Sequence, residues 1–103
     1  MAKSKDEPLT ARQTILDTAK ACVLGDRNNT YGPPTQDFQR TAELWTTLGF
    51  SFNGERVQAH HIAMAMMALK LSRLVWSPRH IDSWIDTAGY AACGYECTGV
   101  MDE

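Results

Sequence analysis

Residues 62–69 read IAMAMMAL, and Ser77 and Pro78 follow eight positions after the run. A stretch without polar side chains is apolar all round a helix, which is typical of a helix surrounded by neighbours. We expect a third, central helix over about residues 55–76. Ser77 would cap the next helix and Pro78 would take its first position, so that a fourth helix runs to about Cys97. Helices joined by so short a turn lie roughly antiparallel.

The first helix is predicted from the signals at its two ends. Thr10 and Gln13 have the spacing of a capping box, and apolar residues follow at helical spacing until Gly25. Residues 1–9 are polar and end close to a proline, so we expect a flexible tail there. With a second tail over residues 100–103, a single helical domain remains over residues 10–99.

Residues 26–34 are expected to form a structured loop without a helix, because Pro33, Pro34 and their neighbours favour turns or extended chain. A second helix should run from about residue 35 or 36 to Leu48, with Trp45 as a core anchor. Asn53 is a candidate N-cap for the third helix. The predicted fold class is an all-α, compact four-helix domain.

The composition limits the kind of protein. The chain of 103 residues is 44% hydrophobic with a formal net charge of -2, so it can build one modest core and has no strong field that would draw it onto nucleic acid. Its three cysteines are too few for a disulfide scaffold and indicate reduced thiols in a cytoplasm. No apolar run approaches the roughly 20 residues that span a bilayer. We therefore expect neither a membrane protein nor a nucleic-acid-binding protein.

Four charged side chains flank the turn between the third and fourth helices. Lys70 and Arg73 are three residues apart and share a helix face, and Asp82 and Asp86, four apart, share another. An antiparallel pair of helices would bring these cations and carboxylates together. They would form either a structural salt-bridge network or a site at which the carboxylates hold Mg²⁺ and the cations hold phosphate. The residues alone leave both alternatives open.

Two other features have ordinary structural explanations. Gly89 inside the fourth helix costs about 1 kcal/mol relative to alanine, and close packing against another helix is the simpler reason for it. His60, His61, Cys93 and Cys97 resemble a zinc-ligand set only superficially, because adjacent helical histidines point about 100° apart. We expect these four to be core or surface residues.

Several short segments form a recognisable set: Ile15-Leu16, Gly25-Asp26-Arg27, Tyr31-Gly32-Pro33, Trp45, Lys70-Leu71-Ser72-Arg73-Leu74 and Asp82-Ser83-Trp84-Ile85-Asp86-Thr87-Ala88-Gly89-Tyr90. Over residues 12–97 this set resembles an uncharacterised family of small phage and prophage proteins. It is also similar to phage nucleotide-modification-associated helical domains and, more distantly, to MazG-like all-α nucleotide pyrophosphohydrolases.

The resemblance implies a nucleotide or a nucleotide-derived phosphate compound as the ligand, with Mg²⁺ as a companion. Cations late in the third helix would contact phosphate, and the loop before the second helix would close the site, unless its tyrosine merely plugs the end of the bundle. The implied ligand-binding residues are Arg27, Tyr31, Lys70 and Arg73, and the implied metal-binding or structural carboxylates are Asp82 and Asp86.

The MazG-like comparison further implies a Mg²⁺-dependent release of pyrophosphate, with acidic pairs from two helices around the metal. Here the chain departs from the pattern. Its second helix offers Asp37 and Glu43, six residues apart, which cannot both face one metal from a regular helix. The first acidic pair is therefore missing, and we assign no catalytic residue.

Two functions follow from these observations. The first is a phage or prophage nucleotide-handling protein that binds its ligand between the third and fourth helices. The alternative is a non-catalytic helical protein that binds a host or phage protein. The apolar third helix, with Trp76 and Trp84 near its end, offers more hydrophobic surface than four short helices cover, so we expect a homo-oligomer.

Overall fold

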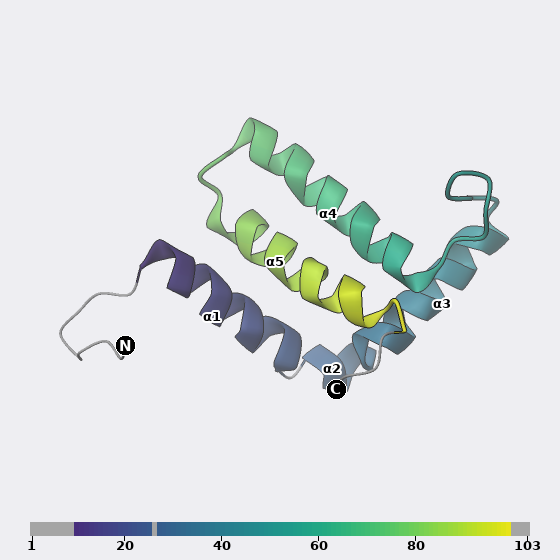
Figure 1. Ribbon diagram of the computed structural model, residues 1–103, viewed down its shortest axis with the longest axis horizontal. Coiled ribbons are helices and arrows are strands. Elements are labelled where there is room, and N and C mark those ends of the chain that lie inside the picture. The colour runs from purple at the N-terminus through teal and green to yellow at the C-terminus, as the bar shows by residue number, and fades with distance from the viewer. Residues whose placement is uncertain (1–9, 26, 100–103) are drawn as a thin grey trace.

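The computed structural model describes residues 10–25 and 27–99, apart from the side chain at position 27. The expected tails, residues 1–9 and 100–103, lie outside the described residues. Four long helices and one short helix make up the described fold, which confirms the all-α class (Figure 1). They are α1 (Ala11–Leu24), α2 (Arg27–Tyr31), α3 (Pro34–Thr47), α4 (Ala59–Trp76) and α5 (Ile81–Glu96).

The first helix begins and ends as its sequence signals predict. The Gln13 N–H donates to Thr10 Oγ1 and the Thr10 N–H donates to Gln13 Oε1, each over 3.1 Å. This reciprocal pair satisfies two of the backbone donors that a helix start leaves open. Gly25 directly follows the last residue of α1.

The segment expected to be a loop throughout contains a short helix, so that prediction was wrong for residues 27–31. α2 has five residues, and the Gly32 N–H closes it by donating to the Asn28 carbonyl over 2.9 Å. The two prolines do not prevent this helix because they stand after it. Pro33 is the N-cap of α3 and Pro34 is its first residue, a position where the missing proline N–H costs nothing.

α4 begins at Ala59, four residues later than expected, and Asn53 is not its N-cap. Asn53 has a φ of 51° and Gly54 a φ of 80°. Across these two residues, Phe52 and Glu55 exchange backbone hydrogen bonds of 2.9 and 3.0 Å. Asn-Gly favours such a tight turn because both residues tolerate the left-handed conformation.

α5 begins at Ile81, three residues later than the predicted start at Pro78. Ser77 completes α4 instead of capping α5, because its N–H donates to the Arg73 carbonyl over 2.8 Å. The His80 N–H then donates to the Ser77 carbonyl over 3.1 Å and closes a turn. The connection remains short, and α4 and α5 lie antiparallel as predicted (Figure 1).

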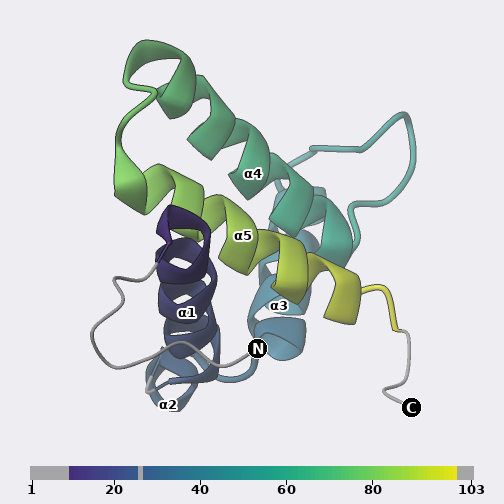
Figure 2. The same ribbon diagram turned by 60° about the vertical axis from the view of Figure 1, so that its left-hand side comes forward.

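α5 lies between α4 and α1 in both views, whereas α4 was expected at the centre (Figures 1 and 2). Two glycines of α5 permit these close approaches. A Cβ atom at Gly89 would lie 3.1 Å from Val23 Cγ1 of α1, and one at Gly94 would lie 2.9 Å from Ala63 Cβ of α4. The expected packing role of Gly89 is therefore confirmed, while α4 keeps an exposed apolar side.

A small core lies where α3 and α4 meet. Its buried members are Ala42, Val57 and Ile62, with Phe38, Trp45 and Met66 packed against them. Trp45 thus takes the core position predicted for it. No helix among the described residues is long and apolar enough to cross a membrane.

Candidate functional site

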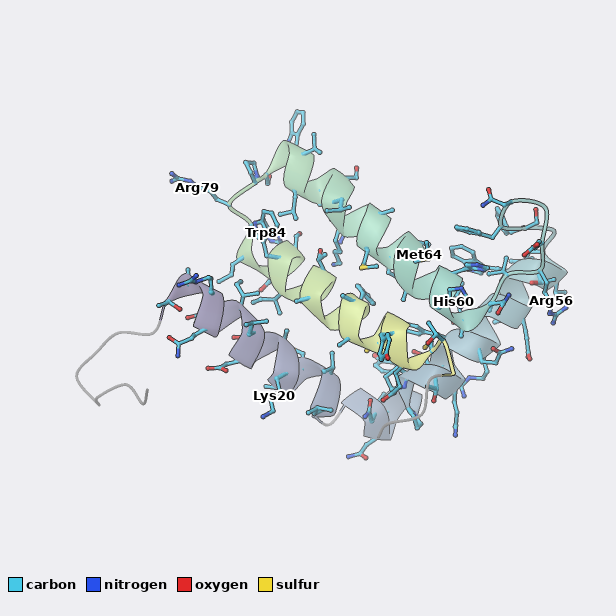
Figure 3. The ribbon with its side chains drawn as sticks, viewed as in Figure 1. Lys20, Arg56, His60, Met64, Arg79 and Trp84 are labelled. Atoms are coloured by element: carbon cyan, nitrogen blue, oxygen red, sulfur yellow. The ribbon has the colours of Figure 1, made fainter. Side chains whose placement is uncertain are left out.

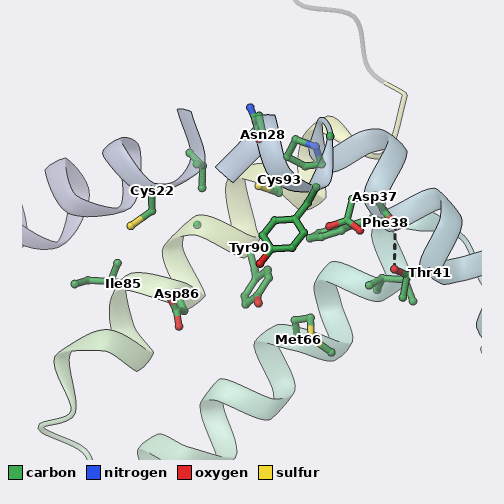
Figure 4. Close-up of a pocket in the computed structure, with 16 residues that line it drawn as sticks. Cys22, Asn28, Asp37, Phe38, Thr41, Met66, Ile85, Asp86, Tyr90 and Cys93 are labelled. Atoms are coloured by element: carbon green, nitrogen blue, oxygen red, sulfur yellow. Dashed lines mark hydrogen bonds between the residues drawn. The ribbon is translucent and has the colours of Figure 1, made fainter. Parts of the chain in front are cut away.

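A cavity of about 240 Å³ opens where the helices converge, and each of the five helices contributes side chains to it (Figure 4). Its lining combines aromatic rings, aliphatic side chains and a few polar groups. The lining residues are Cys22 and Val23 from α1; Asn28 and Tyr31 from α2; Gly32; Pro34, Asp37, Phe38 and Thr41 from α3; Ile62 and Met66 from α4; and Ile85, Asp86, Gly89, Tyr90 and Cys93 from α5.

Aromatic rings form one part of the lining. The ring centroids of Phe38 and Tyr90 lie 6.2 Å apart, with the planes inclined by 37°. Tyr31 also lines the cavity and is 53% exposed, which places it at the opening. Arg40 donates to the Tyr31 carbonyl over 2.7 Å and so fixes the end of α2 against α3. The rings offer faces on which a flat heteroaromatic ligand can stack.

One of the cation–carboxylate contacts expected between α4 and α5 is present beside the cavity. Lys70 Nζ lies 2.7 Å from Asp86 Oδ2. The two side chains are only 15% and 35% exposed, respectively, so water screens this pair less than a surface pair. Because a carboxylate has two acceptor oxygens, Asp86 can hold Lys70 and still accept from a molecule in the cavity.

The other two members of the predicted charge cluster lie elsewhere. Arg73 and Asp82 are exposed, and neither belongs to the described lining of the cavity. Asp82 falls in the first turn of α5, because that helix starts later than expected. The structure therefore brings together Lys70 and Asp86, of which only Asp86 lines the cavity, and leaves Arg73 and Asp82 out of this pair and out of the lining. The side chain of Arg27 lies outside the described part of the chain.

Asp37 is a cavity carboxylate that the sequence reasoning did not select. It lies in the first turn of α3 and lines the cavity together with Asp86. Figure 4 shows the two carboxylates well apart, with Asp37 on the α3 side and Asp86 near Ile85. Glu43 is exposed and accepts from the Gln39 side chain over 3.2 Å. The spacing of Asp37 from other acidic residues does not predict that it lines the cavity. Only the packing of α3 against α5 places it there.

The arrangement of acidic groups bears on the predicted metal. The described residues contain no group of three or more histidine, cysteine or acidic side chains able to hold a metal ion. The cavity instead offers single, separated carboxylates, one of which already holds a lysine. Mg²⁺ commonly takes one or two protein carboxylates together with phosphate oxygens and water. These residues therefore suit Mg²⁺ only as a companion of a bound phosphate.

His61, near the start of α4, has a structural role. The rings of His61 and Phe52 stack with centroids 4.0 Å apart and planes 8° from parallel. His61 Nδ1 also accepts from the N–H of Gln58, the N-cap of α4, over 3.0 Å. Burial and the nearby His60 lower the pKa of His61, whereas Glu55 acts in the opposite direction. His61 thus fixes the start of α4 as a neutral ring.

Cys97, the C-cap of α5, is likewise part of the packing. The Cys97 Sγ lies 3.8 Å from the Pro34 carbonyl oxygen, which joins the end of α5 to the start of α3. Burial, and to a smaller extent the neighbouring Cys93 and Glu96, raise the pKa of the Cys97 thiol to about 11. At neutral pH this thiol is therefore protonated and a poor metal ligand.

These features define an all-α domain with a cavity in which aromatic faces and carboxylates meet. Residues 14–98 match the family described as Domain of unknown function (DUF6378), and the chain belongs to this family. It is 31% identical over 81 residues to the "Gene 55 protein" of Mycobacterium phage D29, covering 79% of this chain and 51% of the phage protein.

A second relative gives the same result. The chain is 33% identical over 78 residues to the "Gene 55 protein" of Mycobacterium phage L5, covering 76% of this chain and 48% of that protein. The chain thus spans about half the length of the curated relatives it matches. No solved structure matches it. The predicted relationship to phage proteins is confirmed.

Proposed function

We propose that the cavity binds a nucleotide or a nucleotide-derived phosphate compound. The observation that carries this proposal is the convergence of Tyr31, Phe38 and Tyr90 with Asp86 in one cavity, where Asp86 holds Lys70 at 2.7 Å. A base needs a flat apolar face and a few hydrogen-bonding groups at its edge. A phosphate needs a cation or a bridging metal ion.

The cavity is small and open on one side. Its volume of about 240 Å³ lies below the roughly 300 Å³ at which drug-sized pockets begin. A base and its sugar would occupy the cavity, and the phosphates would extend toward Lys70. The carboxylates of Asp37 and Asp86 line the cavity and can accept hydrogen bonds from the base. Lys70, 2.7 Å from Asp86, is the cation nearest to that carboxylate and would contact the phosphate.

The resemblance to phage nucleotide-modification-associated domains implies the same class of ligand, whereas the matched family is described only as a domain of unknown function. The segments over residues 70–74 and 82–90 carry the similarity to phage nucleotide-modification-associated domains. We propose binding rather than hydrolysis, because pyrophosphate release of the MazG-like kind relies on acidic pairs from two helices. The described residues offer no such metal-binding group. Mg²⁺ would accompany the phosphate, and Asp86 would be the carboxylate that contacts it.

A thermal-shift screen of nucleosides and nucleotides, with and without Mg²⁺, tests the proposal. A ligand at 100 times its Kd stabilises the folded state by about 2.7 kcal/mol, which in a domain of this size raises the Tm by about 10 °C or more. Calorimetric titration should confirm the ligand at one site per chain. If no nucleoside or nucleotide at millimolar concentration changes the Tm, the cavity does not serve this ligand class. The alternative, a helical protein that binds another protein, would then be favoured.

Variants test whether the ligand lies in the cavity. Tyr31→Ala should raise the Kd about 10-fold, as loss of a stacking ring does, while the free energy of unfolding changes by less than about 1 kcal/mol because the side chain is half exposed. Lys70→Gln should weaken nucleotides but not nucleosides. Arg73→Gln is the matched control, an exposed cation of the same helix outside the described lining. Equal effects of the Lys70 and Arg73 variants would contradict the placement of the phosphate.

A further inference from the structure

The outer side of α4 is an uncharged, apolar surface. α4 is an 18-residue helix whose inner side, represented by Ile62, Ala63 and Leu74, is buried. Along its opposite side, exposed residues recur at intervals of four, three and four positions. We define the outer face of α4 as Met64, Ala68, Leu71, Ser72, Val75 and Trp76, all of which are exposed.

The outer face differs from an ordinary solvent-exposed helix face, which carries charged and polar side chains. Val75 is 87% exposed and Trp76 is 91% exposed, and Leu71 is 51% exposed. None of the six residues of the face is charged. Of the two lysine or arginine residues of α4, Lys70 is turned inward to Asp86. Arg73 lies about 140° of helix rotation from Ala68 and about 160° from Val75, so it points away from these residues of the outer face.

The spacing of the face fits another helix. Met64, Ala68, Leu71 and Val75 have the 4-3-4 periodicity of a coiled-coil seam, which places successive side chains on one stripe facing a partner helix. Ala68 and Ser72 are small and lie between larger neighbours, so a second helix can approach closely there. The stripe runs along the length of α4 from Met64, which Figure 3 shows near the His60 end, toward the Trp84 end of the helix pair.

The area of the face is close to what a dimer needs. An aromatic side chain can bury about 150–250 Å², so Trp76, at 91% exposure, offers on the order of 200 Å² alone. Val75, Leu71 and Met64, which are 87%, 51% and 45% exposed, bring the face to several hundred Å². A standard interface buries roughly 800 Å² per partner, and surface patches of several hundred Å² mark interaction sites. An uncharged seam on one copy matches the same seam on another, because a twofold axis brings identical patches together.

We infer that the outer face of α4 is the contact surface of a homodimer, with α4 of one copy packed against α4 of a second copy. The inner side of α4 faces the core and the cavity, so this surface is independent of the proposed ligand. This inference places the contact of the expected oligomer on one defined set of residues. Trp84, at the turn and 47% exposed, lies outside that set.

Light scattering after size exclusion, on the full chain from about 1 to 200 µM, tests the inference. The wild type should be a dimer at the upper concentrations. Leu71→Glu and, separately, Ala68→Glu should raise the dissociation constant at least about 100-fold, because each would place an unpaired charge in an apolar contact. Leu16→Glu is the matched control, since Leu16 is a 64% exposed leucine of α1, and it should leave the dimer intact.

Circular dichroism should show the same helix content in all variants, since each substitution is at an exposed position. Tryptophan fluorescence supplies a second readout. Because Trp76 is 91% exposed in a single copy, the summed emission of the three tryptophans should shift to shorter wavelength as the wild type is concentrated, and it should not shift in Leu71→Glu. A wild type that stays monomeric at 200 µM overturns the inference. A dimer that survives both face variants, or that is lost in Leu16→Glu, also overturns it by placing the contact on another surface.

Discussion

Asp86 belongs to the proposed binding site and also contributes to the stability of the fold. Its carboxylate joins α5 to α4 through Lys70, which is only 15% exposed. Asp86→Asn should lower the free energy of unfolding by about 1–2 kcal/mol, because it leaves a largely buried ammonium without its charged partner. Asp82→Asn should cost less than about 1 kcal/mol, since Asp82 is exposed and acts mainly on the start of α5. Urea denaturation of both variants at pH 7 compares them.

Equal losses from the two substitutions would mean that the Lys70–Asp86 contact contributes no more than a surface charge. The same pair of variants also bears on the predicted metal. If Asp86 helps to hold Mg²⁺ with a bound phosphate, Asp86→Asn should reduce the Mg²⁺-dependent part of the thermal shift, and Asp82→Asn should leave it unchanged.

His61 should make the stability of the protein depend on pH below neutrality. Its pKa is lowered in the folded state by burial and by His60, so between its folded pKa and about 6.5 the unfolded chain binds more protons. The stability that neutral His61 contributes is therefore complete above about pH 6.5 and is lost as the pH falls toward the folded pKa. Protonation would also remove the Nδ1 acceptor for the Gln58 N–H.

The measurement for His61 is the urea midpoint at pH 7.5 and at pH 5.5. In His61→Gln the slope between these two values should be smaller than in the wild type, because glutamine at this position can accept the same backbone N–H without titrating. His60→Gln is the neighbouring control and should leave a clear slope. An unchanged slope in His61→Gln would assign the pH dependence to other groups.

At the scale of single helices, substitutions at two glycines of α5 allow the effect of helix propensity on stability to be compared with the effect of packing. Gly94→Ala would place a Cβ atom 2.9 Å from Ala63 Cβ, which is fixed to the α4 backbone, so we expect a loss of about 1–3 kcal/mol despite the better helix former. At Gly89 the nearest atom is Val23 Cγ1 at 3.1 Å, which a rotation of the valine can move. Gly89→Ala should therefore be nearly neutral. Thermal unfolding of the two variants gives the comparison, and a larger loss at Gly89 would contradict it.

Helix ends were predictable from the sequence where local chemistry alone determines them. Thr10 and Gln13 form their capping box within four residues, and the prediction for α1 was correct at both ends. Ser77 failed as a cap for α5 because its N–H completes α4, and two helices competed for one residue. Asn53 does not cap α4 because Asn53-Gly54 forms a tight turn before the helix begins.

At the scale of the whole molecule, the site was predictable only as far as two neighbouring helices determine it. The antiparallel pair of α4 and α5 placed Lys70 opposite Asp86, and that contact is present. Asp37 and Phe38 line the cavity from α3. The sequence does not predict which of the other helices α3 packs against. The position of α5 between α1 and α4 also depends on packing at Gly89 and Gly94 rather than on the apolar run that begins at Ile62.

The two sides of α4 should act independently in the whole molecule. Ile62 and Met66 line the cavity from the inner side, whereas Leu71 and Val75 belong to the exposed outer face. A ligand that binds the cavity should therefore bind Leu71→Glu with a Kd within about twofold of the wild-type value, because substitutions without shared contacts act additively. Titration of both proteins with the same nucleotide, at concentrations where light scattering shows a dimer and a monomer respectively, makes the comparison. A monomeric, folded Leu71→Glu that binds at least 10-fold more weakly would show instead that the second copy shapes the cavity through α4.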